Sequence, residues 1–210
     1  MTDDNGNPNV DTPEAKKGLD VLVEGFSSGM IPRDAITYQE EQGRQAFQKG
    51  ELVFHRQWPY QYALAGKTDG SSKVAEKFDV APLPGIDGPG TSSLGGHNLA
   101  LSSFGKNKAT ALDFMKFYSS EENQRLNLTR NSLAPAYAEL YDDPELIEEF
   151  PYLPVLKESI LNAVPRPKVV RYGDATAAIQ DAAYSALTGA QSSAQALADL
   201  QRALEKITHG

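Results

Sequence analysis

Apolar residues recur at helical spacing along most of this chain, and this periodicity constrains its fold more than any other feature. In the last segment, four apolar side chains fall on one face of a helix: Leu197, Leu200, Leu204 and Ile207. Near the start, Thr12 suits a helix N-cap and Pro13 the first helical position. These patterns predict helices over residues 12–28, 38–49, 60–65, 108–119, 120–130, 152–164, 174–188 and 192–208.

Strand signals are few and short by comparison. Residues 51–55, 78–81 and 98–102 are predicted as strands, and the proline-rich residues 135–151 are predicted to form short turns. Residues 85–96 are rich in Gly, Pro and Ser, which is typical of a linker or of a loop that lines a ligand. A helix-rich chain with a few short strands indicates a mixed α/β fold. At 210 residues it can bury one good core or two small ones.

Composition and charge exclude several classes of function. The net charge of −8 argues against a nucleic-acid partner, because phosphate binding needs a basic face. The chain has no cysteine, which excludes disulfides, thiol catalysis and cysteine-ligated metals. No run of about 18 apolar residues occurs, so no membrane span is expected. The polar, acidic N-terminus is unlike a signal peptide.

Aromatic residues gather in one short run, residues 54–62, called the aromatic segment below. It contains Trp58, the only tryptophan of the chain, together with Tyr60 and Tyr62. Aromatic faces suit flat, partly apolar ligands with polar edges, and sugars fit that description. The alternative is that Trp58 and Tyr62 are ordinary core residues. The aromatic segment alone leaves both interpretations open.

Two further loops are candidate binding elements. In the first, the paired glycines Gly95 and Gly96 precede His97 and permit close backbone approach to a ligand. In the second, Pro165 and Pro167 stiffen the backbone around Arg166, whose planar guanidinium can bind vicinal hydroxyls or a carboxylate. Each has a simpler alternative, a plain turn in the first case and a surface arginine in the second.

No catalytic, metal or cofactor motif is found. The three histidines, His55, His97 and His209, are too scattered for a metal-binding motif. A nucleophile elbow and a phosphate-binding glycine loop are both missing. Paired carboxylates occur, but they are more typical of solvated helix ends and turns: Glu121-Glu122, Asp142-Asp143 and Glu148-Glu149. We therefore expect no enzyme, no metal and no cofactor.

Taken in order, several segments resemble the C-terminal half of extracellular solute-binding proteins of ABC sugar importers, the maltose/trehalose-binding type. The similar stretches run along almost the whole chain: Ala46–Glu51, Trp58-Pro59-Tyr60, Val80–Gly85, Gly95–Ser102, Lys106–Phe117 and Pro165–Gly189. The resemblance implies an α/β, type II periplasmic-binding-protein-like fold of two lobes, which close on a sugar by hinge motion.

The resemblance also implies roles for individual residues. Trp58 would be the stacking platform, and Tyr60 a neighbour on the same wall. Gly95 and Gly96 would bring backbone groups to the sugar, His97 stands where the family often has an aromatic residue, and Arg166 would clamp hydroxyls. The ligand would be an oligosaccharide such as maltose or trehalose.

The family's organisation implies partners and lobes as well. Residues 1–84 would belong to the second lobe with the aromatic platform, residues 85–135 would return to the first lobe, and residues 136–210 would supply C-terminal helices of the second lobe. Partners would be the ABC permease subunits and a missing N-terminal half of the same protein. The full-length protein would be extracytoplasmic, in the periplasm or as a cell-surface lipoprotein.

Two other functions stay open on the residues alone. One is a carbohydrate hydrolase that uses the acidic residues, and the other is a helical interaction module in which Trp58 is only a core residue.

Overall fold

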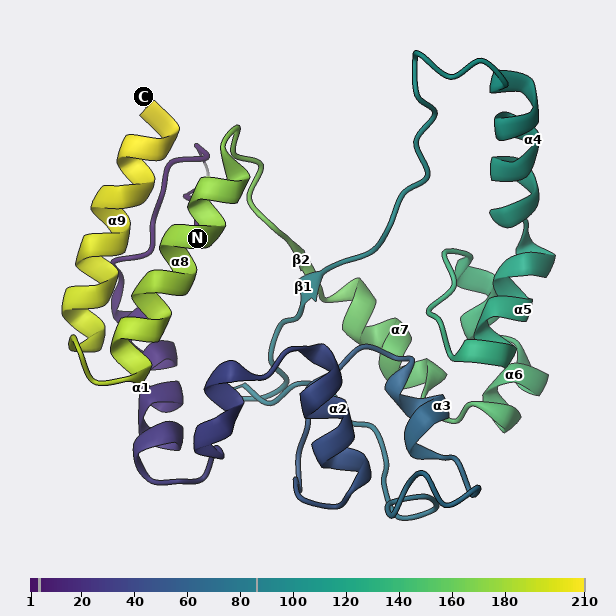
Figure 1. Cartoon of the computed structure of the whole chain (residues 1–210), viewed down its shortest axis with the longest axis horizontal. Helices are drawn as coiled ribbons and strands as arrows, with labels where there is room; N and C mark the ends of the chain where they lie inside the picture. Colours follow the sequence, from purple (N-terminus) through teal and green to yellow (C-terminus); the bar gives the residue numbers. More distant parts are fainter. Residues whose placement is uncertain (4, 86, 210) are drawn as a thin grey trace. The chain divides into compact units, whose positions relative to one another are not determined.

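The computed structural model describes residues 1–3, 5–85 and 87–209, and the chain divides into two compact units. The terminal unit comprises Met1–Tyr38 and Arg166–Gly210, and the central unit comprises Gln39–Pro165. Each unit has its own hydrophobic core. Both units are drawn in Figure 1, coloured along the sequence.

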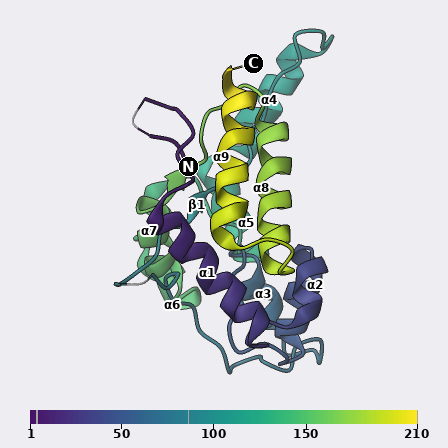
Figure 2. The same ribbon diagram turned by 90° about the vertical axis from the view of Figure 1, so that its left-hand side faces the viewer.

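Helices α1 (Pro13–Ser27), α8 (Tyr172–Leu187) and α9 (Ser193–His209) pack together to form the terminal unit (Figures 1 and 2). A short 3-10 helix, η1 (Arg33–Thr37), follows α1. The Thr12 hydroxyl accepts a hydrogen bond from the Ala15 N–H at 3.2 Å, as expected of the predicted N-cap. The predicted apolar stripe of α9 is confirmed, because its leucines enter a core formed by Val10, Ala175, Leu197, Leu200 and Leu204.

The N-terminal segment is fixed to α9 by the side chain of Gln201. Its amide oxygen accepts a hydrogen bond from the Val10 N–H at 2.9 Å, and its amide nitrogen donates to the Pro8 carbonyl at 2.9 Å. Val10 is buried, so the pair of bonds satisfies backbone groups at the edge of the core.

The central unit contains six α-helices among its described residues: α2 (Glu40–Gln48), α3 (Gln61–Ala65), α4 (Lys108–Tyr118), α5 (Glu121–Asn131), α6 (Pro144–Glu149) and α7 (Leu153–Leu161). Its core lies between α5, α6, α7 and the 3-10 helix η2 (Ala138–Tyr141), and consists of Leu128, Leu140, Tyr141, Leu146, Phe150, Tyr152 and Leu153. Tyr62 of α3 packs against this core, with its ring centroid 4.4 Å from that of Tyr152.

The prediction of turns over residues 135–151 was wrong, since this stretch contains η2 and α6. Asp143 caps α6 by accepting from the Glu145 N–H at 2.9 Å and the Leu146 N–H at 3.2 Å. Pro144 takes the first helical position, where its missing N–H costs nothing.

The three predicted strands were also wrong, because residues 51–55, 78–81 and 98–102 are irregular in the structure. In the described part of the chain, the only named strands are β1 (Ser93–Leu94) and β2 (Val164–Pro165), which pair in parallel. A strand exists only where a second segment completes its hydrogen-bond ladder, so an apolar run does not suffice. In the second predicted strand, Val80 packs against the central core without forming one.

Helix α4 forms at its predicted position, but it buries none of its residues. Three of its aromatic side chains share one side of the helix and form what we call the α4 face: Phe114, Phe117 and Tyr118, all exposed. Leu112 is exposed as well, on the other side of the helix. Its main packing partner is α5 (Figure 1). A helix with an uncovered aromatic face is unusual for a soluble surface.

Candidate functional site

The aromatic segment divides its rings between the core and the surface. Trp58 remains 45% exposed, whereas Tyr62 is partly buried and packs against the central core. Two hydrogen bonds close a turn between them, from the Gln61 N–H to the Trp58 carbonyl at 3.1 Å and from the Tyr62 N–H to the Pro59 carbonyl at 2.9 Å. The core interpretation therefore holds for Tyr62, while Trp58 presents part of its indole to solvent.

The structure brings Trp58 and Gly95 together, although they are distant in the sequence. A Cβ atom placed on Gly95 would lie 2.5 Å from the indole Cη2 and 3.1 Å from Cζ3. Gly95 directly follows β1, whose pairing with β2 holds this end of residues 85–96 in place. Gly96 and His97 come next and are exposed, with nothing within 4 Å of a Cβ placed on Gly96.

Tyr60 is held by the first turn of α2. Its hydroxyl donates to Glu41 Oε1 at 3.1 Å, and Glu41 also forms an ion pair with Arg44 at 2.6 Å. Burial, together with hydrogen bonding to Glu40 and Glu41, raises the pKa of Tyr60 far above its ordinary value of 10.0. The Arg44 hydrogen bond lowers the pKa of Glu41. Tyr60 therefore presents a neutral phenol whose hydroxyl is already engaged.

Gln57 is a residue that the sequence prediction missed. Its side-chain oxygen accepts a hydrogen bond from the Trp58 N–H at 2.9 Å, and its side-chain nitrogen donates to the Glu40 carbonyl at 3.1 Å. The amide thus joins the backbone of Trp58 to the start of α2. No pattern distinguishes such a glutamine from a surface one, because both of its partners are backbone groups.

Arg166 directly follows β2 in the sequence and is exposed. It belongs to the terminal unit, whereas Trp58, Tyr60, Gly95, Gly96 and His97 belong to the central unit. The role of Arg166 therefore stays a prediction.

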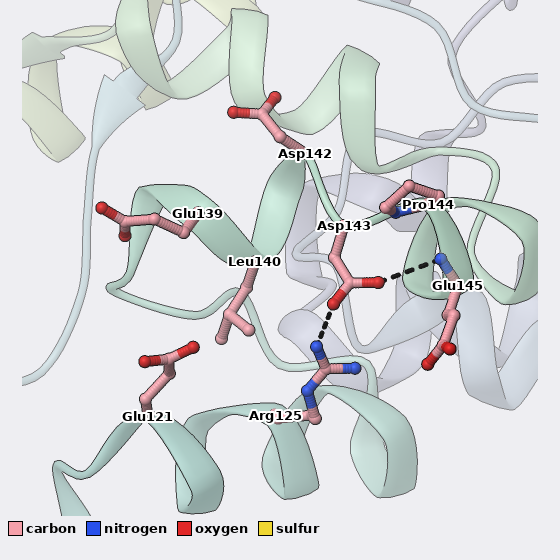
Figure 3. A pocket seen from close by; sticks show the side chains of 8 residues that line it. All are labelled: Glu121, Arg125, Glu139, Leu140, Asp142, Asp143, Pro144 and Glu145. Atoms are coloured by element: carbon pink, nitrogen blue, oxygen red, sulfur yellow. Dashed lines mark hydrogen bonds and ion pairs between the residues drawn. The ribbon is translucent and has the colours of Figure 1, made fainter.

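An open pocket of about 540 Å³ lies between α5, η2 and the start of α6 (Figure 3). It is lined mainly by carboxylates, with Arg125 as the cation that forms an ion pair with Asp143: Glu121, Glu139, Asp142, Asp143 and Glu145. Hydrogen bonding to Arg125, then to the backbone of α6, lowers the pKa of Asp143. Asp142 forms an ion pair with Lys157 at 2.5 Å. Both aspartates of this pair are thus engaged in structural contacts, and no aromatic face lines the pocket.

Among the described side chains, the histidines contribute to no metal site. Across the described ranges, no group of three or more His, Cys, Asp or Glu side chains is placed to hold a metal ion. His55 instead stacks on Phe47, with ring centroids 5.9 Å apart, and its Nδ1 is buried without a hydrogen-bond partner. The side chain of His209 lies outside the described residues. Over the same ranges, no helix is both long and apolar enough to cross a membrane.

Comparison with known proteins agrees with this picture. Residues 1–154 match the family model described as bacterial extracellular solute-binding protein. A probable ABC transporter-binding protein of Deinococcus radiodurans is 33% identical over 99% of this chain and 50% of its own length. The chain therefore spans about half the length of the curated relatives that it matches.

Solved structures give the same result for the fold. Maltose-bound MalE3 of T. maritima is 32% identical, with a TM-score of 0.90 over 98% of this chain and 53% of that one. A tagatose-bound ABC transporter solute-binding protein of Thermotoga lettingae is 22% identical, with a TM-score of 0.86 over 99% and 52%, and shows the fold alone. These likenesses confirm the predicted fold class, a helix-rich portion of a type II periplasmic-binding-protein-like fold.

Proposed function

We propose a sugar-binding role from one premise: the chain belongs to the bacterial extracellular solute-binding protein family. Proteins of this family bind solutes, which agrees with the expectation that the chain is not an enzyme. In our proposal the chain is the sugar-contacting C-terminal half of the binding component of an ABC-type carbohydrate importer.

One observation carries the proposal, namely the half-exposed indole of Trp58. A tryptophan with no ligand role is normally buried for most of its large apolar surface. Trp58 stays 45% exposed, while Tyr62, four residues later, is partly buried against the central core. An open, well-held aromatic face is what stacking against the C–H face of a sugar requires.

The remaining predicted residues are assigned polar roles. We infer that the exposed His97 and the backbone of Gly96 meet the hydroxyl edge of the sugar, with Arg166 as a further clamp. Tyr60 would contribute its ring edge more than its hydroxyl, because Glu41 already accepts the hydroxyl proton. Polar groups of this kind fix the orientation of a ligand that the aromatic face holds.

Maltose or trehalose is the ligand that we propose. The relative with 32% identity was solved with maltose bound, and its likeness covers 98% of this chain. That relative is about twice as long, so the complete site would also include residues from an N-terminal half.

We further propose that the α4 face meets this N-terminal half. The lobe assignment of residues 1–84, 85–135 and 136–210 stays part of the proposal, and α4 lies in the range assigned to the first lobe. Exposed aromatic side chains such as Phe114 and Phe117 support it, since a large apolar face is normally covered. The full-length protein would act outside the cytoplasm and deliver its sugar to ABC permease subunits.

Tryptophan fluorescence during titration with maltose and with trehalose tests the proposal. Trp58 is the only tryptophan of the chain, so any emission change reports on it. We expect one of the two sugars to change the emission without product formation, and Trp58→Ala to weaken binding at least about tenfold by calorimetry. Trp58→Phe, which keeps an aromatic face, should weaken sugar binding less than Trp58→Ala does.

The titration is repeated with an N-terminal half of the protein added. Release of a hydrolysed product would favour the hydrolase instead. Equal calorimetric affinities of the wild-type chain and Trp58→Ala, measured with that half present, would rule out the platform.

A further inference from the structure

The indole of Trp58 rests against the backbone of Gly95. The two ring atoms nearest to a Cβ placed on Gly95, Cη2 and Cζ3, belong to the six-membered ring, at the end of the side chain that lies farthest from the Trp58 backbone. Distances of 2.5 and 3.1 Å leave no room for a methyl group. The backbone of Gly95 is outside the left-handed region, so its conformation does not require glycine there. Space for the ring is the remaining reason for glycine at this position.

Gln57 fixes the backbone end of Trp58. Its amide oxygen accepts from the Trp58 N–H, and its amide nitrogen donates to the Glu40 carbonyl at the start of α2. The backbone of Trp58 is thus tied to a helix, while the far edge of its ring is limited by Gly95. Two points of contact at opposite ends define the direction of a flat side chain.

A second ring of the aromatic segment, the imidazole of His55, also packs against a glycine. His55 lies against Gly43 of α2, where a Cβ would come within 2.7 Å of the imidazole Nε2. On that site as well, the ring occupies the volume that a side chain would fill. Close approach of a ring to a glycine therefore occurs twice within four residues, at His55 and at Trp58.

We propose that Gly95 is a positioning residue, which acts on the ligand through Trp58 by seating its indole and not by contacting the sugar itself. The link to the ligand rests on the proposed function, since it requires that Trp58 stack on a sugar. The seating itself requires no ligand and can be measured without one. This assignment differs from the role that the family resemblance implies, in which Gly95 offers its backbone to the sugar.

Gly95→Ala tests directly whether Gly95 positions the indole of Trp58. The added methyl group would meet the tip of the indole, so the ring should turn away. We expect the emission maximum of Trp58 and its quenching by acrylamide both to change in the absence of sugar. Sugar affinity should fall about three- to tenfold, the range for a lost aromatic contact. The matched control is Gly18→Ala, because nothing lies within 4 Å of a Cβ at that position, and both quantities should remain as in wild type.

A double-mutant cycle separates this role from a general structural one. Phenylalanine at position 58 lacks the ring atoms that the new methyl group would meet. Combining Gly95→Ala with Trp58→Phe should therefore cost no affinity beyond that of Trp58→Phe alone. A direct backbone contact between Gly95 and the sugar would predict equal losses in both backgrounds.

Each result decides the question. Unchanged Trp58 emission and quenching in Gly95→Ala would overturn the positioning role of Gly95, whatever the measured sugar affinity. A changed emission in Gly95→Ala, with no sugar response of the wild-type chain even when the N-terminal half is present, would support the positioning role and count against the proposed function. If circular dichroism shows that Gly95→Ala does not fold, the double variant with Trp58→Phe decides. Recovery of the fold would support a clash between the added methyl group and the indole, and failure of both variants to fold would overturn it.

Discussion

Helices α9 and α4 form at the positions that the sequence predicts, yet they differ in what they bury. α9, in the terminal unit, buries Leu197, Leu200 and Leu204 in a core shared with α1 and α8. α4, in the central unit, buries no residue and exposes Phe114 and Phe117. Apolar spacing thus predicts that a helix forms, while burial depends on whether another segment covers its face.

The partner of α9 is near it in the sequence. α8 ends at Leu187 and α9 starts at Ser193, with Gly189 in the left-handed conformation between them. Such a short connection makes two antiparallel helices neighbours and closes their apolar stripes on each other. For α4, the main packing partner among the described residues is α5.

Leucine truncation should show the largest contrast between the two helices. Leu204→Ala should destabilise the chain by about 2–5 kcal/mol, because this side chain is 4% exposed and truncation leaves a cavity. Leu112→Ala on α4, where the side chain is 44% exposed, should cost less than about 1 kcal/mol. Urea unfolding followed by circular dichroism measures both values. Equal costs would contradict the comparison.

The connection between the N-terminal segment and α9 should have an intermediate effect. Gln201→Ala removes the bonds to Val10 and Pro8 and should cost about 1–2 kcal/mol in unfolding free energy, since a buried N–H loses its acceptor. Gln195→Ala changes an exposed glutamine of the same helix and should stay within about 0.5 kcal/mol. Should the two variants unfold at the same urea concentration, the connection would have no role in the terminal unit.

Acid should weaken the central unit through His55. Burial, and to a smaller extent nearby Arg56, lowers its pKa from the ordinary value of 6.5. As the pH falls below 6.5, His55 binds a proton in the unfolded chain while it stays neutral in the folded chain. This stability is present above the unfolded pKa and is lost as the pH falls through the folded pKa.

Urea unfolding between about pH 7.5 and 5 tests this prediction. His55→Phe keeps a ring beside Phe47 and should flatten the pH dependence, because the variant shares every other titratable group with the wild type. An unchanged pH profile in His55→Phe would exclude His55 as the source.

The smallest effect on stability is expected at the α4 face. Phe117 is 63% exposed, so Phe117→Ser should change the unfolding free energy by less than about 0.5 kcal/mol. The same substitution should reduce self-association at high concentration, because it removes part of an exposed apolar face. Light scattering measures this effect, and Lys116→Ser on the same helix is the polar control. A large loss of stability in Phe117→Ser would mean that α4 is covered in solution.

Helix starts illustrate how far local signals reach. Thr12-Pro13-Glu14 predicted the start of α1, and Asp143-Pro144-Glu145 is the same signal at the start of α6. The second was missed because it lies in a proline-rich stretch, where turns were expected. Strands were harder, since the ladder that defines β1 and β2 joins segments far apart in the chain.

In the candidate site, too, some features were predicted from local sequence and others depend on contacts between distant segments. Resemblance of the sequence to the family identified Trp58, Gly95 and Arg166 as candidates, but it assigned Gly95 to the ligand. The structure places Gly95 against the ring of Trp58, and it adds Gln57, whose two partners are backbone groups.

By itself, the sequence determined the helices and the family of this protein, because spacing, caps and short motifs are local properties of a chain. Only the tertiary structure decided that Tyr62 packs against the core while Trp58 stays exposed, and that one helix is covered while another is not. Burial is a relation between segments distant in sequence, so no pattern within one segment contains it.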